Sequence, residues 1–223
     1  MANLFTPNGF RAVRRYDGAA WAPNVTQYKI SSTNTHKIYY GDPVIRTQGN
    51  TTGNFGYIDG GTAISSGTAP TNQGLLGIFV GCERLSTATG SKIWSNQWSG
   101  GDAQADVDAW VIDDPWVVYR IWCGNSGGTI TAAGTAGGPV TAQSVGLNAA
   151  FAMGVANTYS GISGAYLDTN TSISAGNPTY PLVIVGLYTQ PPGINGTDIT
   201  TAGNVVEVLL NQSAFKAGVT GVA

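Results

Sequence analysis

Short runs of β-branched and aromatic residues, separated by glycine, proline and asparagine, extend through most of this chain of 223 residues. Such runs are typical of strands, and the residues between them favour turns. We expect strands over residues 28–31, 37–40, 44–47, 55–58, 75–83, 105–112, 116–123, 182–188 and 204–211. Many short strands with tight turns predict a mainly β fold, built as an antiparallel sandwich or a barrel-like domain.

Two of these runs carry expectations about their faces. In the run 75–83, strict alternation places Ile78, Val80 and Cys82 on one face. The run 116–123 has apolar residues on both faces, which is typical of a strand that is buried on both sides.

The N-terminal residues differ from the rest of the chain. Residues 1–27 contain the scattered side chains Phe5, Phe10, Val13, Tyr16 and Trp21 among glycine and proline, which predicts an extended N-terminal arm. We expect a single β-rich domain over 28–223, because there is no fixed-period repeat and no proline-rich linker. At most one short helix is expected, over 147–157, where Gly154 weakens the helical pattern.

Charged residues are few: 22 of 223, whereas 32 residues are glycine. Average soluble domains are about 25% charged, and mixed charge keeps a freely diffusing protein soluble. A chain with so few charges either lives outside cells or has much of its surface covered by partners, and we favour the second. Residues 1–50 have six basic and two acidic side chains, a net charge of +4, which favours docking on an acidic surface. They are too sparse for nucleic acid, which needs a dense basic stripe.

The two cysteines, Cys82 and Cys123, each end a strand-like run. We expect buried free thiols in a protein made in a reducing cytoplasm, and a disulfide between them stays open as an alternative. No apolar stretch follows the arginines of the N-terminal region, so no secretory signal is expected. The longest apolar run, 182–188, is far too short to cross a bilayer.

One five-residue segment suggests chemistry. Residues 124–128, Gly-Asn-Ser-Gly-Gly, resemble the nucleophile loop of trypsin-like serine proteases, and His36 precedes them. Only 17 residues separate Asp108 from Ser126, too few for the strands that lie between aspartate and serine in that fold. Asp59 as the acid leaves too few residues after His36 to complete the first barrel. We therefore expect a glycine-rich turn and no enzymatic activity.

Metal and cofactor sites are not expected either. The single histidine and the two cysteines have no paired spacing such as CxxC or HExxH, and no GxxxxGK[ST] loop is present. Five aspartates gather in one region without the spacing of a calcium loop: Asp102, Asp106, Asp108, Asp113 and Asp114. Solvated or interface carboxylates are expected, with a turn over 113–115, and acid–base work on sugars is the alternative.

Five of the six tryptophans also fall in one stretch: Trp94, Trp98, Trp110, Trp116 and Trp122. Tryptophan supplies large contact area in cores and protein interfaces, and we expect packing of this kind. An aromatic cluster also stacks on sugar rings. A carbohydrate-binding module of a phage tail or adhesin, with Trp94 or Trp98 in its site, is therefore the alternative function.

Seven segments, read in order, resemble a known group of proteins. They are residues 8–15 (NGFRAVRR), 39–44 (YYGDPV), 77–83 (GIFVGCE), 110–115 (WVIDDP), 163–168 (SGAYLD), 183–187 (VIVGL) and 205–209 (VVEVL). Together they resemble the tailed-bacteriophage virion proteins that decorate, or cement, the outer capsid surface. The likeness extends from the N-terminus to about residue 211 and lies in the order of the segments.

The resemblance implies a β-rich structural protein of the virion without enzymatic activity. It implies self-association, as a homotrimer, and binding to the major capsid protein on the capsid exterior, after synthesis in the host cytoplasm. No nucleic acid, membrane or cofactor is implied as a partner. We expect the arm to make the partner contacts, and its removal to leave the β fold intact. The expected contact residues are Phe10, Arg11, Arg14, Arg15, Tyr16 and Trp21.

Overall fold

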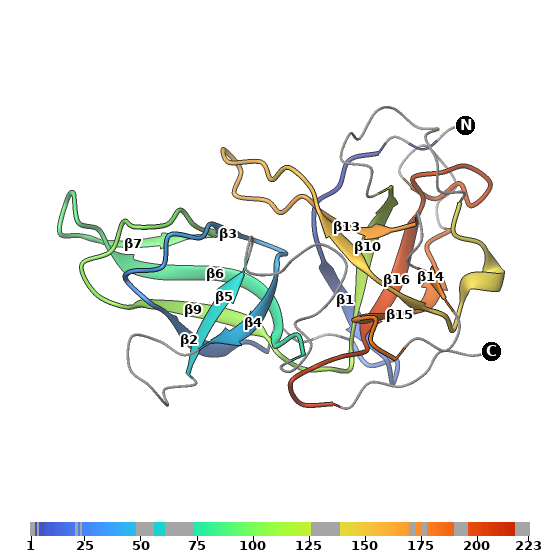
Figure 1. Ribbon diagram of the computed structural model, residues 1–223, viewed down its shortest axis with the longest axis horizontal. Helices are drawn as coiled ribbons and strands as arrows, with labels where there is room; N and C mark the ends of the chain where they lie inside the picture. The colour runs from blue at the N-terminus through green and yellow to red at the C-terminus, as the bar shows by residue number, and fades with distance from the viewer. Residues whose placement is uncertain are drawn as a thin grey trace.

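The protein is nearly all β, as the sequence predicts. The computed structural model describes residues 3, 5–20, 22, 24–47, 56–60, 74–125, 139–169, 173–174, 178–189 and 196–216. Within these residues the helical element is a single 3₁₀ turn, η2 (Ala142–Ser144). The strands form a barrel and a half-barrel, which lie side by side in Figure 1.

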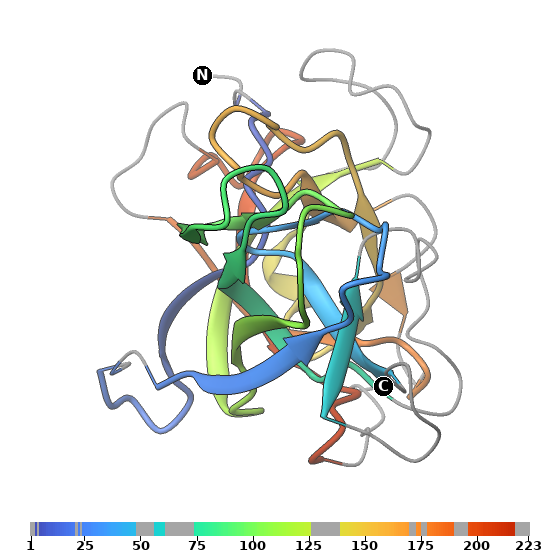
Figure 2. The ribbon, with the colours of Figure 1, turned by 90° about the vertical axis from the view of Figure 1, so that its left-hand side faces the viewer.

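The barrel occupies the left of Figure 1, and Figure 2 views it from that side. Its strands follow the order β4-β5-β2-β9-β6-β7, and β4 also pairs with β6, so that the first five strands close into a ring. Their bounds are β2 (Thr26–Ile30), β4 (Pro43–Thr47), β5 (Tyr57–Gly60), β6 (Gly77–Leu85), β7 (Lys92–Ser95) and β9 (Val107–Ile112). A short separate pair lies beside it, β3 (Ile38–Tyr39) and β8 (Gln97–Trp98).

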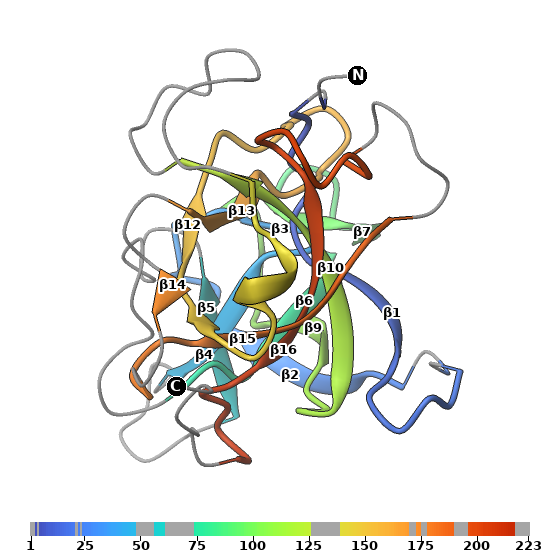
Figure 3. The ribbon, with the colours of Figure 1, turned by 90° about the vertical axis from the view of Figure 1, so that its right-hand side faces the viewer.

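The half-barrel is an eight-stranded sheet, seen from its outer side in Figure 3. Its path is β12-β13-β10-β16-β15-β11-β14, and β1 pairs with β10. The bounds are β1 (Arg11–Arg15), β10 (Val117–Gly124), β11 (Asn148–Ala149), β12 (Phe151–Met153), β13 (Ala165–Asp168), β14 (Ile173–Ser174), β15 (Leu182–Leu187) and β16 (Val205–Leu210). The barrel strands lie in sequence between β1 and β10, which are antiparallel neighbours.

Two hydrophobic cores hold the two sheets. One core contains side chains from β10, β13, β15 and β16, and it extends to Ile45, Ile78 and Ile112 of the barrel strands. The other fills the barrel interior and includes Trp98 and Phe79. Each fully buried large apolar side chain of this kind contributes about 1.5–3 kcal/mol to folding. Because β6 and β9 contribute to both cores, the barrel and the half-barrel share packing along these strands.

The expected common face of Ile78, Val80 and Cys82 is wrong. Ile78 packs in the first core and Val80 against it, whereas Cys82 packs with Phe79 in the barrel interior. The register between β6 and β9 shifts between Phe79 and Gly81, which is a β-bulge. A bulge adds one residue to a strand, so alternation resumes on the opposite face.

The expected helix over 147–157 is also wrong. This stretch forms β11, which pairs with β14 and β15, and β12, which pairs with β13. Ala149, Ala150 and Phe151 are buried there. Helix propensity is a weak preference that tertiary packing overrides. Close backbone approach adds to this, because a Cβ at Gly154 would lie 2.6 Å from the carbonyl oxygen of Gly164.

The described part of the N-terminal segment packs on the chain itself. Residues 11–15 form β1 inside the larger sheet, and residues 26–27 begin β2 of the barrel. The expectation that this arm can be removed without loss of the fold therefore conflicts with the position of β1. Cys82 and Cys123 are buried free thiols, as expected. No described segment forms a helix with the length and apolar character that a membrane crossing needs.

Candidate interaction surface

Phe10 is a core residue. Its ring makes edge-to-face contacts with Tyr119 and Phe151, at centroid separations of 6.0 and 5.9 Å, and it is 1% exposed. Its backbone N–H donates to the carbonyl oxygen of Gly41 at 3.0 Å. Phe10 is therefore not on the surface, where a partner contact requires it.

The three arginines of the segment have partners within the chain. The guanidinium of Arg11 lies 4.6 Å from the ring centroid of Tyr40. Arg14 donates to Glu207 at 2.9 Å, and Arg15 lies 3.4 Å from Asp114. All are partly exposed, so each pair contributes at most about 1 kcal/mol. The positive charge of the first fifty residues is thus partly neutralised by acidic side chains elsewhere in the chain.

Tyr16, in contrast, is exposed and lies beside a second exposed aromatic residue. Its backbone N–H donates to the carbonyl oxygen of Trp116 at 2.9 Å, one residue beyond the Arg15–Val117 pair that ends the β1–β10 ladder. Side chains opposite each other in antiparallel strands lie on the same face. Tyr16 and Trp116 are both about half exposed. Trp21, the remaining expected contact, lies outside the described residues.

The C-terminal region extends this surface. The ammonium of Lys216 lies 4.7 Å from the Trp116 ring centroid, and the guanidinium of Arg46 lies 5.3 Å from that of Phe215, itself about half exposed. We define the aromatic patch by five side chains: Tyr16, Trp116, Phe215, Lys216 and Arg46. Exposed aromatic side chains gathered with cations are typical of interface hot spots.

Local structure holds the patch in place. The backbone N–H of Trp116 donates to Asp114 at 2.9 Å, and Asp114 also attracts Arg15. This is the turn that the Asp-Asp-Pro sequence predicts, and it presents the indole at the start of β10. Burial lowers the pKa of the Lys216 ammonium. The ammonium is therefore partly removed from water, and a cation–π contact is stronger when the cation is desolvated.

A second exposed feature is the loop over 155–160, which the sequence pattern did not indicate. Tyr159 is 98% exposed and Val155 nearly as much. The loop is held by the barrel side of the molecule, because Asn96 donates to the carbonyl oxygen of Ser160 at 2.6 Å and Gln97 to that of Thr158 at 3.2 Å. The side chains of Val155 and Tyr159 are thus exposed on a loop that these hydrogen bonds fix to the barrel side.

The protease-like residues are only partly assembled in the described chain. Nδ1 of His36 lies 2.9 Å from a carboxylate oxygen of Asp59, which also accepts from Asn34 at 3.0 Å. Ser126 lies outside the described residues. The histidine and aspartate thus form a polar contact at the barrel surface, and the expected glycine-rich turn over 124–128 is described only at Gly124 and Asn125.

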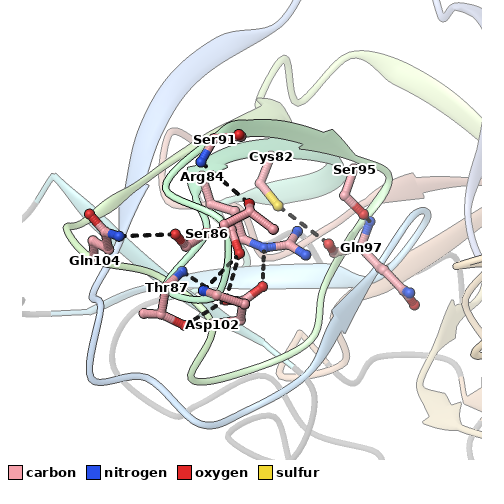
Figure 4. Close-up of polar contacts among 11 residues, drawn as sticks. Cys82, Arg84, Ser86, Thr87, Ser91, Ser95, Gln97, Asp102 and Gln104 are labelled. Carbon is pink, nitrogen blue, oxygen red and sulfur yellow. Dashed lines mark hydrogen bonds and ion pairs between the residues drawn. The ribbon is translucent and has the colours of Figure 1, made fainter.

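The five clustered aspartates have separate structural partners. Figure 4 shows one of them, Asp102, which accepts from Arg84 at 3.2 Å and from the Thr87 hydroxyl at 2.8 Å. These hydrogen bonds, from Thr87 first, lower the pKa of the Asp102 carboxyl. Nearby, burial raises the pKa of the Cys82 thiol to about 11, against the opposing effect of Arg84, so the thiol stays protonated at neutral pH.

The other four aspartates also bind side chains of neighbouring segments: Asp106 binds Tyr57, Asp108 binds Lys29, Asp113 binds Tyr28 and Asp114 binds Arg15. Within the described ranges no three histidine, cysteine, aspartate or glutamate side chains are arranged to hold a metal ion.

The tryptophans divide between core and surface. Trp98 is buried in the barrel core and Trp122 is almost fully buried, so Trp98 is inaccessible to a sugar. Trp94 is exposed and lies against Trp110 on the outside of the barrel. The predicted core packing therefore describes Trp98 and Trp122, whereas the sugar-binding alternative remains open for Trp94 and not for Trp98.

Comparisons with known proteins give no neighbour: no family model, no curated protein and no solved structure matches the chain.

Proposed function

We propose that the protein is a virion structural protein that binds the outer surface of a phage capsid and cements adjacent major capsid protein subunits. In this proposal it acts as a homotrimer, without enzymatic activity, and the aromatic patch contacts the capsid protein. The observation that carries the proposal is the half-exposed pair Tyr16 and Trp116, with Phe215 beside them, on a chain with only 22 charged residues. The ordered segments that resemble decoration proteins agree with it.

The small number of charged residues supports the proposal that the protein is a subunit of an assembly. Interface cores are depleted of charged residues and enriched in aromatic residues and arginine. The patch shares the three aromatic side chains and one arginine, Arg46, with such cores and has Lys216 in addition. Two nearby arginines are already paired within the chain, Arg14 with Glu207 and Arg15 with Asp114. Binding at the patch therefore removes the aromatic surface from water, and acidic groups of the partner would pair with Arg46 and Lys216.

A cementing role requires that the protein bind the assembled shell. A ligand that binds only the assembled state stabilises that state by mass action. Subunits that cement a shell permanently bury about 2,000 Å² or more. The patch alone is smaller than this, so in the proposal the exposed loop over 155–160 supplies contacts between copies of the chain.

The test measures capsid binding after removal of the central aromatic side chain. Truncating a hot-spot tryptophan costs about 2 kcal/mol or more, a loss of roughly 30-fold in affinity. We expect Trp116→Ala to lose co-sedimentation with capsids that lack the protein. Trp94→Ala is the matched control, because Trp94 is as exposed but lies on the barrel.

The oligomeric state is measured by light scattering on the purified protein. A mass three times that of one chain is expected, and Tyr159→Ala is expected to reduce it. A stable monomer that fails to bind capsids contradicts the proposal. Co-sedimentation of Trp116→Ala with capsids at the wild-type level contradicts it as well.

A further inference from the structure

Trp94 and Trp110 form an aromatic pair on the outside of the barrel, and neither residue belongs to the aromatic patch. Their ring centroids are 4.4 Å apart with an interplanar angle of 47°, and Trp94 is 59% exposed. Trp94 lies on β7 and Trp110 on β9, the two strands that flank β6. The pair therefore spans three neighbouring strands.

Gly81 of β6 makes this arrangement possible. It lies opposite Trp110 in the register, and a Cβ added to it would lie 3.3 Å from a ring atom of Trp94. The missing side chain lets the indole of Trp94 extend across β6 toward Trp110. The same bulge that turns Cys82 into the barrel interior turns Gly81 outward, so the platform depends on it.

Two ion pairs border the platform on the same face. Lys92 pairs with Glu83, and Lys29 pairs with Asp108. Alternation places Lys92 beside Trp94 on β7 and Asp108 beside Trp110 on β9, while Glu83 and Asp108 are register partners. The border therefore has two positive and two negative groups and no net charge. These side chains offer both hydrogen-bond donors and acceptors next to an apolar ring face.

We propose that the Trp94–Trp110 platform binds a neutral saccharide. A sugar ring has an apolar face that stacks on an indole and hydroxyl groups at its edge that both donate and accept hydrogen bonds. The platform matches both features, because its apolar face is bordered by carboxylates and ammonium groups. Small-molecule sites combine aromatic walls with a few polar groups in this way.

The charge distribution argues against other ligands. Nucleic acid and anionic polymers require a net positive surface, which paired Lys29–Asp108 and Lys92–Glu83 do not provide. A protein interface core is depleted of charge, whereas four ionised groups surround this pair within two residues along each strand. The site is independent of the capsid-binding proposal, since it lies on β7 and β9 and shares no residue with the aromatic patch.

The test uses the whole protein on an array of neutral and charged glycans, followed by calorimetry with the glycan that binds best. Selective binding of neutral glycans is expected. Loss of one stacking indole is expected to weaken binding about tenfold or more in Trp94→Ala. Glu83→Gln is expected to weaken it less, because the amide keeps one acceptor. Trp116→Ala is the matched control and is expected to bind the glycan as the wild type does.

Each result decides the proposal. Failure of the protein to bind any neutral glycan on the array overturns the proposal. Glycan binding by Trp94→Ala with wild-type affinity overturns it as well. If Trp94→Ala instead loses capsid binding, the platform is a protein contact and the saccharide proposal fails, while the control role of this variant in the capsid assay fails with it. Circular dichroism of each variant verifies the β fold.

Discussion

Asp42 is a buried carboxylate that no cation of the described residues neutralises, and its replacement by asparagine is expected to stabilise the protein at neutral pH. The residue is 0% exposed. One carboxylate oxygen accepts from the backbone N–H of Tyr39 at 2.8 Å, and the other, Oδ1, is buried without a hydrogen bond. Burial raises the pKa of Asp42 from 3.8 to about 6, although the hydroxyl of Ser163 and the backbone N–H of Tyr39 act in the opposite direction.

The pKa shift sets both the size and the sign of the effect. Each unit is worth about 1.4 kcal/mol, so a rise from 3.8 to about 6 corresponds to a cost of about 3 kcal/mol for the ionised form. The folded protein binds this proton more tightly than the unfolded chain. The free energy of unfolding therefore falls as pH rises from about 4 to about 6 and stays low above that range.

The Asp42→Asn substitution removes the ionisation and keeps an acceptor for the Tyr39 N–H. The new amide N–H₂ would replace the unpaired Oδ1, and an unsatisfied buried amide costs about 1 kcal/mol or more. Asp42→Asn is therefore expected to raise the free energy of unfolding by about 1–3 kcal/mol at pH 7, and by about 0 kcal/mol or less at pH 4.

Urea unfolding from pH 4 to pH 8 measures this difference directly. Asp17→Asn is the control for loss of one negative charge, because the side chain of Asp17 is mostly exposed. A difference between wild type and Asp42→Asn that does not change with pH refutes the reasoning. A variant that is less stable than the wild type at pH 7 refutes it as well.

Two further substitutions test the packing. Phe10→Ala is expected to lower the free energy of unfolding by about 3–5 kcal/mol in thermal or urea unfolding, because Phe10 is a core residue. The control Tyr16→Ala is expected to change it by less than about 0.5 kcal/mol, because Tyr16 is exposed. Equal effects would contradict the placement of Phe10 in the core. Gly77→Ala is expected to lower the free energy of unfolding by about 2 kcal/mol or more, because the added Cβ would lie 2.1 Å from the carbonyl oxygen of Ile112. Gly186→Ala is the control, since a Cβ there would have no neighbour closer than 3.8 Å.

Four of the strands that sequence reasoning found share one property, a continuous run of β-branched or aromatic residues. The runs over 75–83, 116–123, 182–188 and 204–211 correspond to β6, β10, β15 and β16. Their preference is local, so the pattern alone predicts them. The helix expected over 147–157 failed because alanine has no such preference, and the pairing of β11 and β12 with distant strands decides their conformation.

Long-range pairing also explains the misplaced arm. The aromatic residues of 1–27 are scattered along the segment, and nothing local shows that Phe10 packs on Tyr119, more than a hundred residues later. The bulge at Phe79–Gly81 is a similar case, because alternation continues in the sequence where the structure changes phase. A glycine within an otherwise strong strand was the available signal of a bulge, and Gly81 is that residue.

Surface position was the least predictable property of the candidate sites. Trp98 and Trp116 are the same residue type in the same aspartate-containing stretch, yet one lies in the barrel core and the other on the surface. The distinguishing signals are positional. Trp116 follows an Asp-Asp-Pro turn, and Trp94 alternates with the exposed Lys92. Both signals place a tryptophan at a strand end or on a polar face, and neither specifies what binds it.

The place of β1 changes how a partner contact near the N-terminus can be tested. Truncation of residues 1–27 removes β1 and Phe10 with it, so loss of capsid binding by that variant would reflect loss of the larger sheet. Tyr16 and Trp116 lie beyond the paired part of β1 and β10, where side chains reach solvent and the ladder ends. A substitution there changes the surface and leaves the pairing intact. The capsid-binding proposal therefore depends on point variants of the patch, and Trp94 and Trp116, both exposed among the described residues, supply each other's control.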